Sequence, residues 1–226
     1  MLTSFIQILG HTLPLLCPGC LQAQRAGLLC PVCESYLATI DDPCPSCGAP
    51  GTSFEVCGAC LKRPPPWESL HGAWHFEGLA RYLIHQFKYQ HNIAAGRALV
   101  TLWLAQQTAL FKPEAVVAVP MHYRKQQQKG FNQADWLARQ IGQHWSIPQW
   151  RGARRIKATA PLEGLDKGQR KKMLRAAFGL TDTPPRSVAL VDDVLTTGST
   201  AAELTRLLKK NGSQFVSVWV LARTPR

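Results

Sequence analysis

The 226-residue chain has no apolar run long enough to span a bilayer, and it is poor in acidic residues. It has 14 Asp and Glu residues against 26 Lys and Arg residues, for a formal net charge of +12. Residues 1–16 have no basic start and are interrupted by His11 and Pro14, so they do not read as a secretory signal. We therefore expect a cytoplasmic protein without membrane insertion, in which thiols stay reduced unless a metal holds them.

Two common phosphate-binding signatures are also missing, since the chain has neither the G-x-x-x-x-G-K-[ST] run nor the G-x-G-x-x-G turn. Residues 187–210 instead read SVALVDDVLTTGSTAAELTRLLKK. The apolar run 187–191 predicts a buried parallel strand, and leucines repeat at helical spacing beyond it, at Leu204, Leu207 and Leu208. Residues 196–200 should therefore form a turn at the carboxyl end of a strand.

The composition of this turn favours a phosphate ligand. The first amides of a helix have no intrahelical partner and carry the positive end of the helix dipole, so they bind anions. Gly198 permits close approach of the backbone, and hydroxyls flank it at Thr196, Thr197, Ser199 and Thr200. Asp192 and Asp193 would repel phosphate but accept hydrogen bonds from sugar hydroxyls. The pattern indicates a sugar phosphate; the alternative is an ordinary capped helix, which requires no paired acids.

A hydrophobic strand followed by DD, TTG and ST resembles the phosphoribosyl pyrophosphate (PRPP) motif of type I phosphoribosyltransferases. Almost the whole chain resembles the ComF/GntX family, through its four cysteine pairs and the motifs KRPPPW at 62–67, LIHQFKY at 83–89, VAVP at 117–120 and KGFNQ at 129–133. The resemblance implies an α/β fold of the type I phosphoribosyltransferase kind, a mostly parallel sheet flanked by helices, preceded by an N-terminal double zinc ribbon. It also implies a role in competence or in the use of extracellular DNA.

The resemblance also implies a ligand, PRPP with Mg²⁺, and a set of site residues. Asp192 and Asp193 would be the catalytic pair that holds the ribose hydroxyls. The remaining PRPP-binding positions would be Val191, Thr196, Thr197, Gly198, Ser199, Thr200, Pro120, Met121, Arg124, Lys125 and Lys129.

Residues 151–178 resemble the family segment that covers the cleft, with Arg154, Lys157 and Arg170 as further ligand candidates. Leu162 and Met173 stand where relatives commonly carry Gln and Asn, which leaves the acceptor open.

The three prolines within residues 62–67 predict a stiff spacer and a boundary between units 1–66 and 67–226. The first unit has 3 basic and 4 acidic residues, whereas residues 124–175 alone have 13 basic and 3 acidic ones. The positive electrostatic field of such a basic segment attracts polyanions. We therefore expect PRPP or a related phosphoribose and, as further partners, single-stranded DNA or DNA-uptake proteins. The alternative is a solvated basic face without a specific partner.

Eight cysteines form four C-x-x-C pairs separated by nine, ten and nine residues. A C-x-x-C turn points two thiolates at one tetrahedral ion, and four thiolates leave no open coordination position, so we expect structural Zn²⁺ sites. The shortest loops group the ligands as Cys17, Cys20, Cys30 and Cys33 for one ion and Cys44, Cys47, Cys57 and Cys60 for the other. Interleaved pairing, a disulfide framework and a redox C-x-x-C are the alternatives.

Three functions fit these patterns. In a transferase, a nitrogen nucleophile would displace pyrophosphate from the anomeric carbon of PRPP. A regulatory protein would bind PRPP without transfer, and a DNA-binding accessory protein would stack bases on Trp136, Trp145 and Trp150. The remaining expectations concern structure. Asn132 is either a helix cap or a ligand contact, His85 should lie on the surface, and one helix face should consist of Leu79, Tyr82, Leu83 and Phe87.

Overall fold

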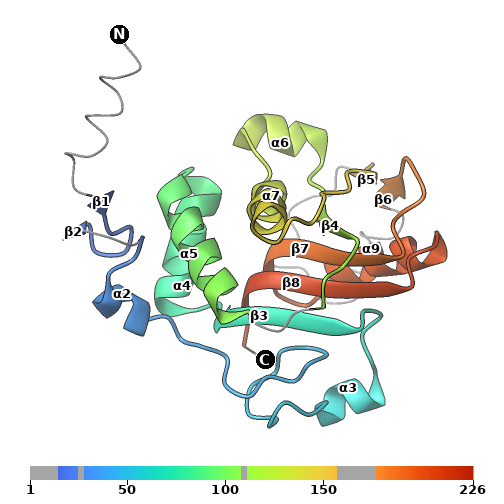
Figure 1. Ribbon diagram of the computed structural model, residues 1–226, viewed down its shortest axis with the longest axis horizontal. Helices are drawn as coiled ribbons and strands as arrows, with labels where there is room; N and C mark the ends of the chain where they lie inside the picture. Colours follow the sequence, from blue (N-terminus) through green and yellow to red (C-terminus); the bar gives the residue numbers. More distant parts are fainter. Residues whose placement is uncertain (1–14, 25–27, 108–110, 157–176, 226) are drawn as a thin grey trace.

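The computed structural model describes residues 15–24, 28–107, 111–156 and 177–225. Its centre is a four-stranded parallel sheet in the order β3-β8-β7-β4 (Figure 1). The strands are β3 (Ser69–His75), β4 (Ala115–Ala118), β7 (Ser187–Leu195) and β8 (Phe215–Arg223). Almost every side chain of β7 and β8 is buried, as expected of parallel strands covered on both faces.

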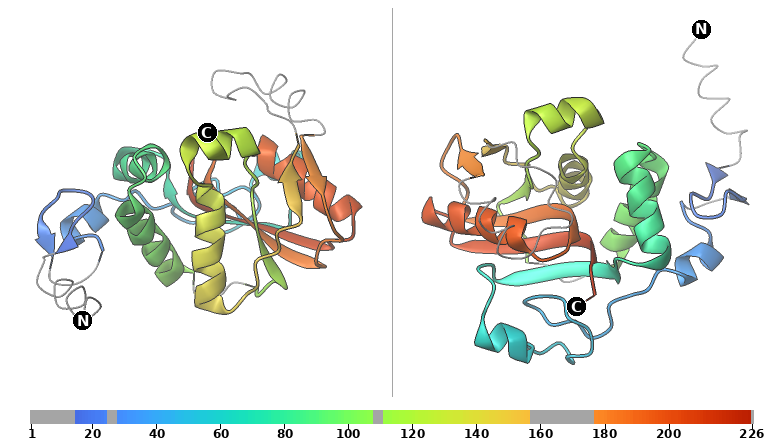
Figure 2. Two further views of the ribbon diagram at one scale, coloured as in Figure 1. Left: turned by 90° about the horizontal axis from the view of Figure 1, so that it is seen from above. Right: turned by 180° about the vertical axis from the view of Figure 1, so that it is seen from behind.

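Helices cover both faces of this sheet (Figure 2). On one face lie α4 (Gly78–Tyr89), α5 (Ile93–Gln106) and α7 (Gln133–Trp145), which share a core cluster with Val191 and Trp219. On the other lies α9 (Ser199–Lys210), whose Leu204 and Leu208 pack against the alternate strand residues, among them Leu190. The predicted α/β class, with a mostly parallel sheet flanked by helices, is confirmed.

The apolar face predicted for α4 is partly wrong. Leu83 and Phe87 are buried as expected, but Tyr82 is 49% exposed. The buried face instead includes Ala80 and Ile84, because the helix turns its i, i+3, i+4 and i+7 positions toward the core. His85 is exposed, as expected, and stacks with Phe76 and Tyr89 at the surface.

Three short elements complete the second half of the chain: α6 (Tyr123–Lys129) and the antiparallel pair of β5 (Ala153–Arg155) with β6 (Phe178–Leu180). Residues 148–150 run along the free side of β4. There the Val116 N–H donates to the Pro148 carbonyl at 3.0 Å, and the Trp150 N–H donates to the Val116 carbonyl at 2.9 Å. The chain therefore leaves β4 outward, on the α7 face, before it returns to β7.

The cysteine-rich part contains the hairpin of β1 (Leu15–Leu16) and β2 (Ala23–Gln24), then α2 (Pro31–Ser35) and α3 (Gly58–Lys62). In Figure 1 the β1–α2 segment lies beside α4, and α3 lies below β3. The segment between them follows the outer side of β3. Ile40 N–H donates to the Ala73 carbonyl at 3.1 Å, and His75 N–H donates to the Ala38 carbonyl at 2.9 Å. The free side of β3 is thus paired.

Within the described ranges, we find no helix that combines the length and the apolar character needed to cross a membrane.

Candidate phosphoribose and zinc sites

Strand β7 carries the acidic pair to the carboxyl edge of the sheet. The strand was expected to end at residue 191, but it continues through Asp192 and Asp193 to Leu195. The extension forms because Val194 and Leu195 are buried and stay in register with Ala222 and Arg223 of β8. The aspartates are therefore held by strand geometry and point to opposite faces of the sheet.

The turn after β7 has the expected form. Gly198 has φ 72° and ψ 5°, in the left-handed region that favours glycine, and it is the N-cap of α9. Thr197 Oγ1 and Ser199 Oγ lie 2.9 Å apart, which places two hydroxyls beside the first amides of the helix. A depression at this point is lined by Asp192 and residues 194–201. Backbone amides at the start of α9, side-chain hydroxyls and one carboxylate meet in it, and the Ser199 N–H donates to Thr197 Oγ1 at 3.4 Å.

The loop after β4 begins beside β7, since the Val119 N–H donates to the Val191 carbonyl at 2.9 Å. The chain leaves β4 outward over the α7 face and leaves β7 toward β8 through α9 on the other face. Connections that diverge from neighbouring strands open a crevice at their carboxyl ends, where open α/β sheets bind ligands. Pro120 and Met121 lie in this loop and are half-buried.

A lysine that the sequence interpretation left unassigned neutralises one of the aspartates. Lys88 Nζ lies 2.8 Å from Asp193 Oδ2, and the exposed fractions of the two side chains are 23% and 8%. Burial works against the charge of Lys88, but the carboxylate of Asp193 outweighs it and raises the pKa of the ammonium. Gln133 Nε2 donates to the Lys88 carbonyl at 3.1 Å and anchors that end of α4.

Asp192 is the less buried member of the pair, and its environment disfavours its charge. Desolvation and the neighbouring charge of Asp193 raise the pKa of Asp192 to about 7, although Lys88 and Arg155 act in the opposite direction. Asp192 Oδ1 accepts a hydrogen bond from the Asp193 N–H at 2.9 Å, which holds the carboxylate in place. A raised pKa in a crevice is typical of functional sites.

Asp192→Asn should stabilise the protein above pH 7, by about 1–2 kcal/mol after allowance for partial exposure. The folded-state pKa lies above the ordinary value, so the neutral acid is favoured by folding. The contribution of protonated Asp192 to the free energy of unfolding is complete below about pH 4 and is lost as the pH rises through about 7. Asparagine keeps the Oδ1 acceptor and has no charge to desolvate. Urea unfolding at pH 5 and pH 8 measures the effect, and equal stability of the two proteins at pH 8 would refute it.

The basic residues predicted around the diphosphate lie on α6, and neither Arg124 nor Lys129 is among the described residues that line the depression. Arg124 donates to the Tyr123 hydroxyl at 3.0 Å, Lys129 Nζ lies 4.5 Å from the centre of the Tyr89 ring, and Lys125 belongs to the same helix. Asn132 is a helix cap, accepting from the Ala134 N–H at 3.1 Å.

The other predicted residues divide into three groups. The side chain of Val191 is buried in the core, so its backbone is the part that faces the loop after β4. Arg154 is exposed and bonds to the carbonyls of Arg151 and Ala153. Lys157 and Arg170 lie outside the described residues.

The three tryptophans considered as base-stacking platforms are engaged in packing. Trp145 lies 5.3 Å from Trp219 and Trp136 lies 5.2 Å from Phe87, measured between ring centres, while Trp150 packs beside the α9-side core. All three are half-buried. Their spacing in the sequence is compatible with base stacking and with core packing, and the tertiary structure shows that they pack.

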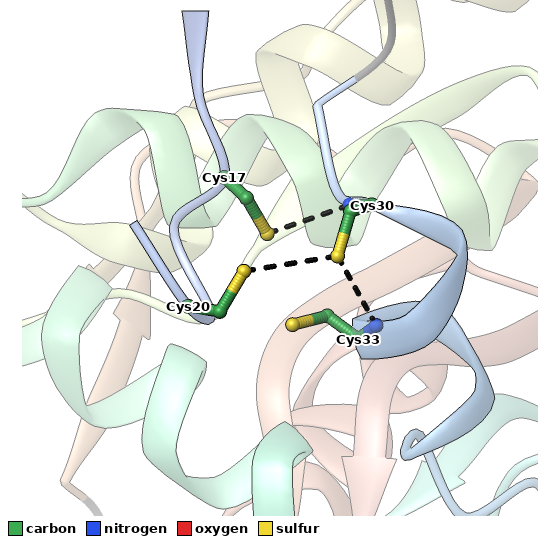
Figure 3. Close-up of side chains that lie close together, drawn as sticks. All are labelled: Cys17, Cys20, Cys30 and Cys33. Atoms are coloured by element: carbon green, nitrogen blue, oxygen red, sulfur yellow. Dashed lines mark hydrogen bonds between the residues drawn. The ribbon is translucent and has the colours of Figure 1, made fainter. Parts of the chain in front are cut away.

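The eight cysteines form two four-sulfur clusters with the predicted grouping. Figure 3 shows the first of them, formed by Cys17, Cys20, Cys30 and Cys33. Within each cluster the sulfur atoms lie within 4.8 Å of one another. The Cys20 and Cys30 sulfurs are 3.8 Å apart, and those of Cys47 and Cys57 are 3.7 Å apart. A tetrahedron with Zn–S bonds of 2.3 Å has edges of about 3.8 Å, so both clusters fit zinc. Sequential pairing is confirmed over interleaved pairing.

Backbone amides support the thiolates in both clusters. Cys30 N–H donates to Cys17 Sγ and Cys57 N–H donates to Cys44 Sγ, each at 3.4 Å. Burial and the neighbouring thiols raise the pKa of Cys33 far above its ordinary value. A divalent cation would offset the repulsion between neighbouring thiolates. Four sulfur ligands fill its coordination sphere, so the sites suit a structural ion.

No protein-family model matches the chain. It is 37% identical over 225 residues to DNA utilization protein YhgH of Escherichia coli K12, covering 94% of this chain and 99% of that protein. It is 36% identical over 222 residues to competence protein F of Haemophilus influenzae, covering 92% and 95%. Because the similarity extends over nearly the full length of each protein, the chain belongs to the family of these DNA utilization and competence proteins, the ComF/GntX family.

Proposed function

We propose that the crevice between the ends of β4 and β7 binds PRPP with Mg²⁺, and that the protein serves DNA utilization through this site. The observation that carries the proposal is the meeting of Asp192 with the hydroxyls and backbone amides of residues 196–200 at a topological switch point. The amides and hydroxyls would hold the 5-phosphate, and the carboxylate would accept hydrogen bonds from the ribose hydroxyls. Mg²⁺ would neutralise the diphosphate.

The two aspartates have different roles in this proposal. Asp192 faces the depression and is the ribose contact, whereas Asp193 is buried against Lys88 and keeps the strand end and α4 together. Pro120 and Met121 would offer the backbone of the neighbouring loop to the diphosphate. Arg124, Lys125 and Lys129 would add long-range attraction from α6.

In a transfer reaction, the bond between the anomeric carbon and the diphosphate oxygen breaks and a carbon–nitrogen bond forms. The diphosphate leaves with the electron pair, and the proton of the nucleophile passes to solvent. The residues of the site orient the ribose and stabilise the departing charge, and none of them needs to become covalently attached. Pyrophosphate release with a panel of nitrogen bases separates this activity from PRPP binding without transfer.

The partners proposed for this chain are DNA or proteins of DNA uptake. The names of the relatives, DNA utilization protein and competence protein F, support this proposal. So does the concentration of basic residues in the second half of the sequence, since polyanions are attracted along such a surface.

Asp192→Asn should weaken PRPP–Mg²⁺ binding at least tenfold at pH 8, because an amide is a poorer acceptor than a carboxylate for two ribose hydroxyls. Calorimetry with the full chain measures this. In the unmodified protein, affinity should also rise as the pH rises through about 7, where Asp192 ionises. The matched control is Asp182→Asn, an exposed aspartate in the loop that leads into β7, at the opposite end of that strand.

Equal heats for the unmodified protein and Asp192→Asn, or a loss of affinity that Asp182→Asn shares, would contradict the assignment. Absence of any PRPP–Mg²⁺ binding by the unmodified protein would refute the proposed function itself.

A further inference from the structure

Trp67 connects the second cysteine cluster to the turn at the start of α9. Its indole Nε1 donates to the Ser46 carbonyl at 2.7 Å, and Ser46 lies between the cluster residues Cys44 and Cys47. At the other end of the same indole, Cη2 lies 3.0 Å from the position that a Cβ on Gly198 would occupy. One rigid side chain therefore contacts both the cysteine turn and the cap of the helix.

The cysteine turn at residues 44–48 is held against the sheet at more than this point. Leu70 N–H donates to the Pro45 carbonyl at 2.8 Å, so two successive carbonyls of the turn accept from the β3 side. Gly48 has φ +65°, and an added Cβ there would lie 2.7 Å from Leu70 Cδ2 and 3.1 Å from Arg223 Cδ. A shift of residues 44–48 would consequently displace Trp67 and the residues of β3 and β8 that contact this turn.

Among the residues that the structure describes, the second cluster contains no apolar side chain other than its cysteines and Ala49. Its buried residues are Cys44, Cys47 and Cys60, with Ala49 and Cys57 packed against them. Such a cluster has little apolar surface of its own, so the conformation of residues 44–48 depends on the ion that joins the four sulfurs. The first cluster is different, because Cys17, Cys30 and Cys33 share the large core with Leu29, Leu37 and the residues of α4.

We propose that Trp67 is a positioning residue that transmits metal occupancy of the second cluster to residues 196–200. Cys44 and Cys47 would bind the metal and so fix the turn between them, which contains Ser46. The Ser46 carbonyl orients the indole, and the indole packs beside Gly198 and keeps the first turn of α9 in its binding geometry. The expected loss of ligand affinity rests on the proposed function above. The expected loosening of the turn does not, because it is a property of the protein alone.

Hydrogen exchange of zinc-loaded full-length protein tests the loosening directly. Cys57→Ser removes a ligand that lies outside residues 44–48, so it acts on Ser46 through the ion. Amides in the first turn of α9, where Ala202 N–H donates to the Gly198 carbonyl, should exchange about tenfold faster, within the 5–150-fold range usual for coupled sites. The matched control is Cys30→Ser, because Cys30 is the equivalent ligand of the first cluster and occupies the N-cap position of α2 as Cys57 occupies that of α3.

Trp67→Phe keeps all eight cysteines and an aromatic ring while removing the donor to Ser46. We expect faster exchange in the first turn of α9 and unchanged zinc content. Trp219→Phe is its control, since it removes an indole donor to Ser217 Oγ at 2.9 Å on the other face of the sheet. This pair tests the proposal even if Cys57→Ser does not fold.

Unchanged exchange at the start of α9 in Trp67→Phe, or equal acceleration in Trp219→Phe, would overturn the proposal. Calorimetry with PRPP–Mg²⁺ then distinguishes a failure of the coupling through Trp67 from a failure of the proposed function. If the unmodified protein binds no PRPP but the exchange pattern holds, the coupling stands and the proposed function fails. If it binds PRPP and Trp67→Phe matches it in both affinity and exchange, the coupling alone fails.

Discussion

A strong chelator should release two zinc ions per chain and unfold the cysteine-rich region, because the second cluster has almost no apolar core to replace the metal. Structural zinc contributes roughly 10–16 kcal/mol in small zinc-binding peptides, as much as the whole stability of a typical domain. We therefore expect the apparent melting temperature to fall by at least 10 °C. Thermal unfolding followed by circular dichroism, with released zinc measured by a colorimetric indicator, records both quantities.

A reducing agent without chelator is the control for this experiment. Zinc-bound thiolates need no oxidation, so reductant alone should leave the melting temperature unchanged. A disulfide framework would behave in the opposite way, losing stability to reductant and none to the chelator. That result, or the release of no metal, would contradict the assignment of the two clusters as zinc sites.

Lys88→Met should destabilise the protein by about 3 kcal/mol at pH 7 to 8, since it leaves the carboxylate of Asp193 buried without its counter-ion. The raised pKa of Lys88 keeps the ammonium charged throughout this range, so the ion pair is intact in the unmodified protein. The double variant Lys88→Met, Asp193→Leu removes both charges and should recover most of the loss. Urea unfolding of the three proteins gives the free energies.

Arg139→Met provides the comparison for an exposed ion pair. Arg139 lies 3.5 Å from Asp135 one helical turn away, and its side chain is 54% exposed. Pairs of this kind contribute less than about 1 kcal/mol. If Lys88→Met costs no more than Arg139→Met, the contact between α4 and β7 is not the buried ion pair described here.

The local features of the site follow from the sequence, because they depend on residues close together in the chain. The turn at 196–200, the capping glycine and the grouping of cysteines all close over short separations. The resemblance to the ComF/GntX family depends on the same short motifs, and the comparisons confirm it. The end of β7 was placed too early, because Val194 and Leu195 are buried by β8, a strand whose position the local pattern does not reveal.

The partners of the site residues could not be predicted, since they come from distant parts of the chain. Lys88 and Asp193 are joined by the packing of α4 on the sheet, and Trp67, which precedes β3, meets Gly198 at the start of α9. The three half-buried tryptophans show the same difficulty. Their amphipathic side chains suit a surface or a core, and the packing reveals which: Trp145 packs on Trp219, Trp136 on Phe87, and Trp150 beside the α9-side core.

The pairing of residues 38–45 with β3 means that removing the cysteine-rich region by truncation would expose one side of this strand. A strand with unpaired backbone groups is a template for association with another molecule, and β3 has seven residues. The N-terminal segment satisfies Leu70, Ala73 and His75 along that side. A truncated protein that begins at residue 67 would present this row to its neighbours and tend to aggregate. By covering that side of β3, the cysteine-rich region would also reduce self-association.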